Sequence, residues 1–174
     1  MGNVMHAHKI PLVSKYDDAR GNIRKFFESD AQFGVSQVLT SFTRNANTFR
    51  GLHCQLGRNS EEKMIICNSG ELIWVSVDFS KFNCHETFFE SYLKIKAGEA
   101  VKIPKNCLNG MLSKSNNVSL TILASRPYSP NCGVTVNPFG DYFLKDFSMK
   151  NDLKSSKRTF HSDELSQNEF VKLL

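Results

Sequence analysis

Residues 72–78 read Leu-Ile-Trp-Val-Ser-Val-Asp, at the centre of a predicted strand over residues 71–79. Ile73, Val75 and Val77 alternate with the other residues of the run, so they share one face of an extended strand. Turn-forming segments separate this run from others rich in Val, Ile, Leu and Phe, which span 38–42, 63–67, 87–95, 99–103 and 118–124. Many short strands at such spacing predict an all-β sandwich or barrel.

Length and charge exclude several classes of protein. A chain of 174 residues has the length of one domain and buries a core without a disulfide or a metal. Its net charge of +5 comes from scattered basic residues, whereas a nucleic-acid site needs a basic patch. We find no apolar run long enough to span a membrane and no signal peptide, so we expect a cytoplasmic protein without nucleic-acid or membrane partners.

The five cysteines are odd in number and form no Cys-x-x-Cys pair. This spacing fits neither a disulfide framework nor a zinc cluster. We therefore expect buried, reduced thiols.

Helical periodicity is convincing only at the end of the chain. Phe170, Leu173 and Leu174 follow the capping-box pattern of residues 166–169. We expect one domain over residues 1–174, with a core of about 10–140, a C-terminal wrap over 141–174 and a short helical segment within that wrap.

Chemistry-bearing residues are densest around residues 50–55, Arg-Gly-Leu-His-Cys-Gln, with Lys63 eight residues later. An imidazole flanked by two cations can remove a proton from carbon beside a carbonyl, with the cations holding an anionic substrate and the developing enolate. The alternative is a core histidine beside two solvated basic residues. Spacing alone does not separate these two interpretations.

An ordered series of motifs extends this constellation over about residues 10–140. It consists of Asp18-x-Arg20-Gly21, Arg50-Gly51-Leu52-His53-x-Gln55, Lys63, Gly70-Glu71, Val75-x-Val77-Asp78, Pro104, Asn109-Gly110, Tyr128-x-Pro130, Gly133 and Asn137-Pro138. The series resembles the dTDP-4-dehydrorhamnose 3,5-epimerase family, nucleotide-sugar epimerases with a cupin jelly roll. The resemblance implies that fold and an isomerase.

The resemblance also implies roles for individual residues. His53 matches the general base that removes the proton at C3 or C5 of a 4-keto-6-deoxy sugar nucleotide, and Lys63 matches the lysine that stabilises the enolate. The acid that pairs with the histidine corresponds to Asp163, with Glu169 as an alternative. The positions that match substrate-binding residues are Arg20, Phe27, Gln37, Arg50, Gln55, Asn109 and Tyr128.

Two departures from the family pattern concern the chemistry. Asn109 replaces a second active-site histidine, and Ile122 stands where the family has its catalytic tyrosine. An aliphatic side chain donates no proton, so the sequence leaves open which group returns a proton from the opposite face.

The metal-binding cupin motif keeps one ligand-type side chain, His53, and places Lys63 in its acidic position. We therefore predict no metal and no cofactor.

The sequence thus predicts an isomerase or epimerase that abstracts a proton beside the keto group of a 4-keto-6-deoxy sugar nucleotide, dTDP-linked, for surface polysaccharide (lipopolysaccharide or capsule) biosynthesis. Two alternatives remain: a sugar ketoisomerase, and a non-catalytic nucleotide-sugar-binding cupin. The family resemblance further implies a homodimer.

Overall fold

Twelve strands and two 3-10 turns make up the part of the chain that the computed structural model describes, residues 7–19, 21–26, 34–78 and 89–135. The strands are β1 (His8–Ile10), β2 (Ser14–Asp18), β3 (Gly21–Lys25), β4 (Gln37–Thr43), β5 (Phe49–Gln55), β6 (Lys63–Ser69), β7 (Glu71–Asp78), β8 (Phe89–Lys96), β9 (Ala100–Ile103), β10 (Cys107–Ser113), β11 (Val118–Ala124) and β12 (Gly133–Thr135). The 3-10 turns are η1 (Gly57–Asn59) and η2 (Pro130–Cys132).

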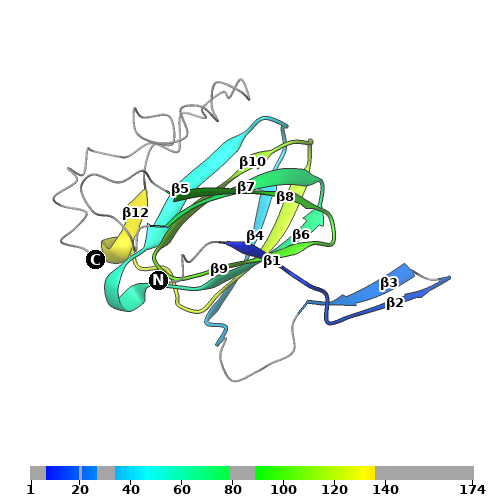
Figure 1. Cartoon of the computed structure of the whole chain (residues 1–174), viewed down its shortest axis with the longest axis horizontal. Coiled ribbons are helices and arrows are strands. Elements are labelled where there is room, and N and C mark those ends of the chain that lie inside the picture. The colour runs from blue at the N-terminus through cyan, green and yellow to red at the C-terminus, as the bar shows by residue number, and fades with distance from the viewer. Residues whose placement is uncertain (1–6, 20, 27–33, 79–88, 136–174) are drawn as a thin grey trace.

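Ten of these strands form two five-stranded antiparallel sheets that face each other (Figure 1). Sheet 1 has the strand order β1-β9-β6-β11-β4, and sheet 2 has the order β12-β5-β10-β7-β8. Strands that neighbour each other within a sheet are mostly distant in the sequence, as in a jelly roll. The remaining pair, β2 and β3, forms a hairpin that extends away from the sheets (Figure 1).

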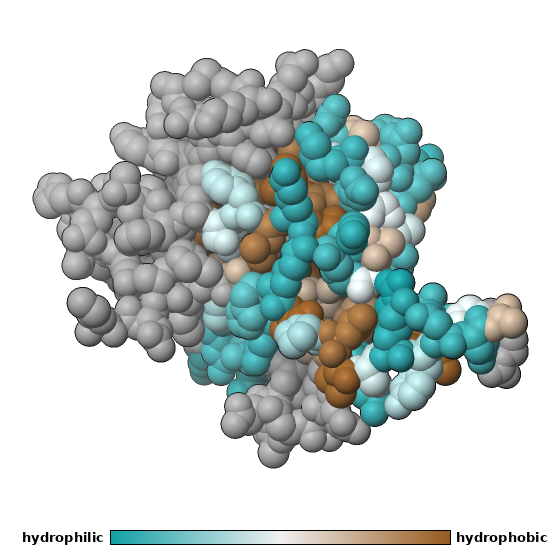
Figure 2. All heavy atoms as spheres, turned by 45° about the vertical axis from the view of Figure 1, so that its right-hand side comes forward, coloured by the Kyte–Doolittle hydropathy of each residue, from teal (hydrophilic) through white to brown (hydrophobic). Residues whose placement is uncertain are grey.

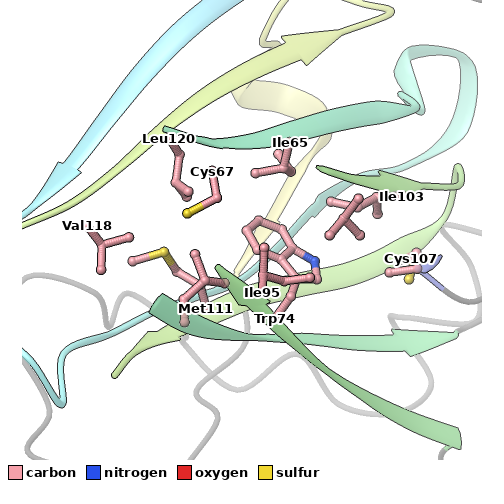
Figure 3. Close-up of a cluster of buried hydrophobic side chains, with 12 residues drawn as sticks. Ile65, Cys67, Trp74, Ile95, Ile103, Cys107, Met111, Val118 and Leu120 are labelled. Carbon is pink, nitrogen blue, oxygen red and sulfur yellow. The ribbon is translucent and has the colours of Figure 1, made fainter. Parts of the chain in front are cut away.

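Apolar side chains from both sheets pack into a cluster between them (Figure 3). Ile65 and Cys67 come from β6 and Leu120 from β11, whereas Trp74 and Met111 come from sheet 2. Because strand side chains alternate between faces, these residues identify the inner face of each strand.

A second cluster covers the outer face of sheet 2. It includes the alternating residues Val75 and Val77 of β7, with Ile73 packed against it. The predicted common face of these three residues is therefore confirmed. Sheet 2 buries apolar side chains on both faces, and all seven residues of β10 are buried.

Two glycines let β5 and β10 approach closely beside His53. A Cβ atom on Gly110 would lie 2.7 Å from the Arg50 carbonyl oxygen and 3.0 Å from the Gly51 Cα, both backbone atoms. Gly51 has φ +129°, which L side chains rarely adopt. The pairing of the two strands also shifts register between Asn109 and Met111. Glycine at both positions is thus a geometric requirement of this strand pair.

The predicted all-β fold is confirmed, and six predicted strands correspond to β4, β6, β7, β8, β9 and β11. Six observed strands have no counterpart in the prediction: the site strands β5, β10 and β12, and the N-terminal strands β1, β2 and β3. Cys54, Cys67 and Cys107 are free and buried as expected, whereas Cys132 is half-buried. The predicted C-terminal wrap and its helical segment lie outside the described residues. No helix among the described residues is long and apolar enough to cross a membrane.

Replacing Gly110 with alanine tests the close approach of β5 and β10. The added methyl group meets backbone, so we expect a loss of about 1–3 kcal/mol in the free energy of unfolding. That loss corresponds to roughly 2–4 °C in melting temperature per kcal/mol for a chain of this size. Gly34→Ala is the control, because a Cβ there meets nothing within 4 Å. Equal melting temperatures for the two variants, measured by calorimetry, would contradict the requirement.

Candidate active site

Sheet 2 presents His53 and Asn109 toward the interior. Asn109 lies between Cys107 and Met111, both members of the inter-sheet cluster, so its side chain shares their face. His53 is the register partner of Asn109. Its neighbours Leu52 and Cys54 belong to the outer cluster. His53 therefore faces the interior from sheet 2.

Sheet 1 presents Lys63 from the opposite side. Lys63 alternates with Ile65 of the inter-sheet cluster and pairs with Ala124, whereas Ile65 pairs with Ile122. Lys63 and Ile122 are thus diagonal neighbours on the inner face. Ile122, which the sequence resemblance matches to the family's tyrosine, packs against the inter-sheet cluster and contributes only an aliphatic surface.

The environment of His53 keeps its imidazole neutral. His53 is exposed to solvent. Partial desolvation by its neighbours nevertheless lowers the pKa of His53 from its ordinary value of 6.5, and the positive charges of Lys63 and Arg50 lower it further. Its Nδ1 lies 3.0 Å from the hydroxyl of Thr135 on β12, the strand that pairs with β5. When Nδ1–H donates to this hydroxyl, Nε2 keeps its lone pair and can accept a proton. A neutral imidazole with one ring nitrogen available to accept a proton is what a general base requires.

Lys63 forms an ion pair with Glu61. The Lys63 Nζ and Glu61 Oε1 atoms are 2.7 Å apart, and the two side chains are 19% and 8% exposed. The Glu61 carboxylate is therefore close to fully buried against this ammonium group. Sequence reasoning did not select Glu61.

Arg50 connects the two sheets at the β4 edge. Its Nη1 donates to the carbonyl oxygen of Phe42 at 3.1 Å and lies 3.5 Å from the Thr43 hydroxyl. The residue itself remains exposed. A guanidinium held by one nitrogen keeps the planar, multi-donor geometry that suits phosphate oxygens.

Two glutamines fix the segment that carries Tyr128. Gln55 donates to the Pro127 carbonyl oxygen at 3.1 Å and accepts a hydrogen bond from the Ser129 N–H. Gln37 accepts from the Tyr128 N–H at 3.0 Å. The Tyr128 side chain is nevertheless 66% exposed. The structure thus holds the backbone of residue 128 and leaves its aromatic ring accessible.

Gln55 and Asn109 have their amide groups engaged by the protein. Gln55 is 2% exposed and also contacts the Asn59 carbonyl oxygen at 3.3 Å. The Asn109 amide donates to the carbonyl oxygens of His53 and Cys107, both at 2.9 Å. These bonds hold the site's strands and loop in place. That both side chains also bind substrate stays a prediction.

Two further polar groups on the inner face of sheet 2, in Ser76 and Trp74, have no hydrogen-bond partner. Ser76, which pairs with Asn109 across β7 and β10, is fully buried, and its hydroxyl is unpartnered. The indole N–H of Trp74 is buried and unpartnered as well.

The thiol of Cys54, next to His53 in the sequence, is not a candidate acid or base, because burial raises the pKa of Cys54 to about 12.

The described residues include five of the predicted binding positions and two of the three predicted catalytic ones. Arg20, Phe27 and Asp163 lie outside them, as does Glu169. Sequence reasoning missed Thr135 and Glu61. The signal for Glu61 is its even spacing from Lys63, which places both on one face of an extended chain. Among the described residues, no group of three or more His, Cys, Asp or Glu could hold a metal ion. The prediction of a metal-free site remains a prediction.

Comparison with known proteins identifies the family. The family model for dTDP-4-dehydrorhamnose 3,5-epimerase matches residues 9–165, which is most of the chain. The chain belongs to this family of sugar epimerases. No curated protein sequence matches the chain. The family prediction and the cupin fold that it implied are therefore confirmed.

Solved structures of the epimerase family share the fold at low sequence identity. The rmlC epimerase of Mycobacterium tuberculosis is 21% identical with a TM-score of 0.78, covering 100% of this chain and 91% of that chain. ChmJ of Streptomyces bikiniensis, a 3'-monoepimerase solved as a double mutant with dTDP, is 21% identical with a TM-score of 0.77, covering 100% and 90%. The Legionella pneumophila enzyme, solved with dTDP-4-keto-L-rhamnose, is 16% identical with a TM-score of 0.66, covering 88% and 90%.

Titration of the His53 ring tests the arrangement of charges. We expect a midpoint below 6.5 by NMR, and Lys63→Met should raise it because one of the lowering charges is lost. The unfolded chain takes up this proton more readily, so His53 favours the folded state above pH 6.5 and this contribution is lost as the pH falls through the folded-state pKa.

Lys102→Met is the matched control, since Lys102 lies on the same sheet but alternates with the inner-face residues Val101 and Ile103. It should leave the His53 midpoint unchanged. A wild-type midpoint at or above 6.5 would show that the cations do not act on His53.

Proposed function

We propose that this epimerase abstracts a proton beside the keto group of a dTDP-linked 4-keto-6-deoxy sugar. The observation that carries the proposal is the placement of a neutral imidazole, His53, and an ammonium group, Lys63, on facing sheets. Structures of relatives with dTDP and with dTDP-4-keto-L-rhamnose support the choice of substrate.

The proposed reaction begins at His53. Its Nε2 takes the C3 or C5 proton, and the electron pair of the broken C–H bond moves onto the C4 oxygen as an enolate. The Lys63 ammonium stabilises that negative charge in an interior that is otherwise largely apolar. The Thr135 hydroxyl holds the imidazole in its orientation. It does so either in place of Asp163 or together with it.

The nucleotide is held at the same end of the sheets. Arg50 contacts the diphosphate, together with Arg20, and Tyr128 supplies an exposed aromatic face for the base. Phe27 and Gln37 belong to the same proposed contact set. Gln37 contributes by fixing the backbone of Tyr128.

Solvent deuterium exchange into dTDP-4-keto-6-deoxyglucose tests this function. Wild-type protein should incorporate deuterium at C3 or C5, measured by mass spectrometry and NMR. His53→Ala should reduce the rate about 10²–10⁴-fold while leaving dTDP affinity little changed, because the phosphates are held elsewhere. Gln37→Ala is a control that should weaken dTDP binding more than it slows exchange at saturation.

The outcome also separates the alternatives. Binding of dTDP-sugar without any exchange would identify the non-catalytic binding protein and overturn the proposal. Movement of the keto group from C4 to C3, visible in the product spectrum, would identify a ketoisomerase. Unchanged exchange in His53→Ala would remove His53 from the mechanism.

The biological setting is part of the proposal. An enzyme that changes the stereochemistry of an activated deoxy sugar supplies building blocks for glycosyl transfer, and we place it in the cytoplasm in surface polysaccharide synthesis. Nucleotide sugars made in that compartment are its source of substrate.

A homodimer is the proposed assembly. The hairpin β2–β3 exposes Tyr16 and Ile23, which are register partners and are 65% and 70% exposed. The edge strand β4 exposes Val38 and Phe42. Figure 2 shows hydrophobic atoms open at the surface close to the projecting hairpin. A projecting strand pair and an exposed apolar sheet edge on one chain favour a second copy as the partner.

Sedimentation velocity tests the assembly. Wild-type protein should sediment at twice the chain mass of 19.7 kDa, and Ile23→Asp should shift it toward the monomer because a charge cannot be buried cheaply in an apolar interface. Tyr92→Ser removes an exposed aromatic residue from β8, an edge strand of sheet 2, and should leave the mass unchanged. A monomeric wild-type protein at micromolar concentration would refute the dimer.

A further inference from the structure

Epimerisation requires a second proton-bearing group on the face opposite His53, and Ile122 cannot supply it. The base takes its proton from the side of sheet 2. To invert the carbon, a proton must return from the side of sheet 1. The residues of sheet 1 that face the interior opposite His53 therefore decide whether inversion is possible.

At the end of sheet 1 where β6 begins, the described inner face offers one group that can donate a proton. Ile65, Ile122 and Ala124 are apolar, and Lys63 lies among them as their strand neighbour. Cys67 lies farther along β6, where its thiol donates to the Ser69 carbonyl oxygen at 3.4 Å. On β4, the register partners of Ile122 and Ala124 are Leu39 and Gln37, and neither an aliphatic side chain nor an amide is an acid. Lys63 is thus the inner-face residue of this end that carries a transferable proton.

Tyr128 is on the wrong side for this task. A Cβ built on Gly133 would lie 3.4 Å from the Tyr128 ring and hydroxyl, so that side chain lies against β12. Strand β12 belongs to sheet 2, the sheet that carries His53. A proton from Tyr128 would return on the side from which it left.

The segment before Lys63 is anchored on both sides of Glu61. The Ser60 hydroxyl donates to Asn106 Oδ1 at 2.7 Å and accepts from the Asn106 N–H at 3.1 Å. The Glu62 N–H donates to the Ser125 hydroxyl at 2.8 Å, and the Ser125 N–H donates to the Glu62 carbonyl oxygen at 3.0 Å. The buried Glu61 carboxylate is thereby fixed at 2.7 Å from the Lys63 ammonium. A long, flexible lysine side chain is held in one place.

We propose that Lys63, positioned by Glu61, returns the proton from the sheet 1 face and so replaces the missing tyrosine. This inference rests on the proposed function. Lys63 is then a catalytic residue with a second task, and Glu61 is a positioning residue. An ammonium group has three protons, so it can hold the C4 oxygen with one and deliver another to the adjacent carbon.

The proton balance closes with water. His53 Nε2 forms an N–H bond as the substrate C–H bond breaks, and the electron pair forms the enolate. The carbonyl then re-forms while the carbon takes a proton from Lys63 Nζ on the other face. This leaves an imidazolium at His53 and a neutral amine at Lys63. The imidazolium releases its proton to water, the amine takes one from water, and nothing is oxidised or reduced.

The substitution Lys63→Arg separates the two tasks of Lys63. A guanidinium keeps the positive charge that stabilises the enolate, but it does not give up a proton in proteins. Deuterium exchange and net inversion of dTDP-4-keto-6-deoxyglucose are measured in the same D₂O reaction, with the product reduced and its stereochemistry read by NMR. We expect exchange to fall by about tenfold or less and inversion to fall by about 10²–10⁴-fold.

A second pair of variants tests Glu61 and guards against a folding defect in Lys63→Arg. Glu61→Gln removes the carboxylate that fixes the ammonium and should lower the ratio of inversion to exchange. Glu62→Gln is the neighbouring control, because the Glu62 carboxylate forms its ion pair with Lys102, at 3.9 Å. It should leave the ratio unchanged. A purely structural role for Glu61 would change melting temperature without changing this ratio.

The outcomes distinguish this inference from the proposed function. Absence of exchange in the wild-type protein refutes the proposed function. Exchange without inversion in the wild-type protein keeps the function as an enolising enzyme and refutes Lys63 as the second donor. Inversion that keeps pace with exchange in Lys63→Arg refutes it as well. Loss of inversion with exchange retained establishes it.

Discussion

Burial of the apolar cluster between the two sheets is the constraint on which the site depends. Once Ile65 and Leu120 face Trp74 and Met111, the alternation of each strand determines the face of every other residue. Lys63 faces inward because Ile65 does. A register slip of one residue in β6 would place Met64 inside and Lys63 outside, so the stability of the core and the position of the ammonium group have the same origin.

The strands that the sequence predicts are those with one apolar and one polar face, or with a dense run of β-branched residues. β7 has such a run of β-branched residues, and Ile73, Val75 and Val77 lie on one face as their alternation predicts. β5 and β10 escaped prediction because they are partly polar and contain Gly51 and Gly110, while β10 is buried along its whole length. Burial on both faces removes the alternation from which a strand is recognised. The strands that carry His53 and Asn109 were therefore the strands with the weakest signal in the sequence.

The candidate site divides in a similar way. His53 and Lys63 were found from their chemistry, and the structure places them on facing sheets. Gln55 and Asn109 were selected for the same reason, yet their amides hold backbone. A motif contains residues that contact the substrate together with residues that hold the others, and sequence does not distinguish them. Thr135 was missed because its contact with His53 spans 82 positions and depends on the pairing of β12 with β5.

The anchoring of Tyr128 has an evolutionary consequence. Gln37 and Gln55 bind the main chain around residue 128 and make no demand on its side chain. The ring can therefore be exchanged for another without loss of the loop's conformation. Given the proposed role of Tyr128 as the aromatic face for the base, substitutions at this one position would alter which base is accepted while the imidazole and the ammonium group stay where they are. A lineage with this architecture can acquire a new nucleotide preference in single steps, each of which leaves a folded protein with its reacting groups in place.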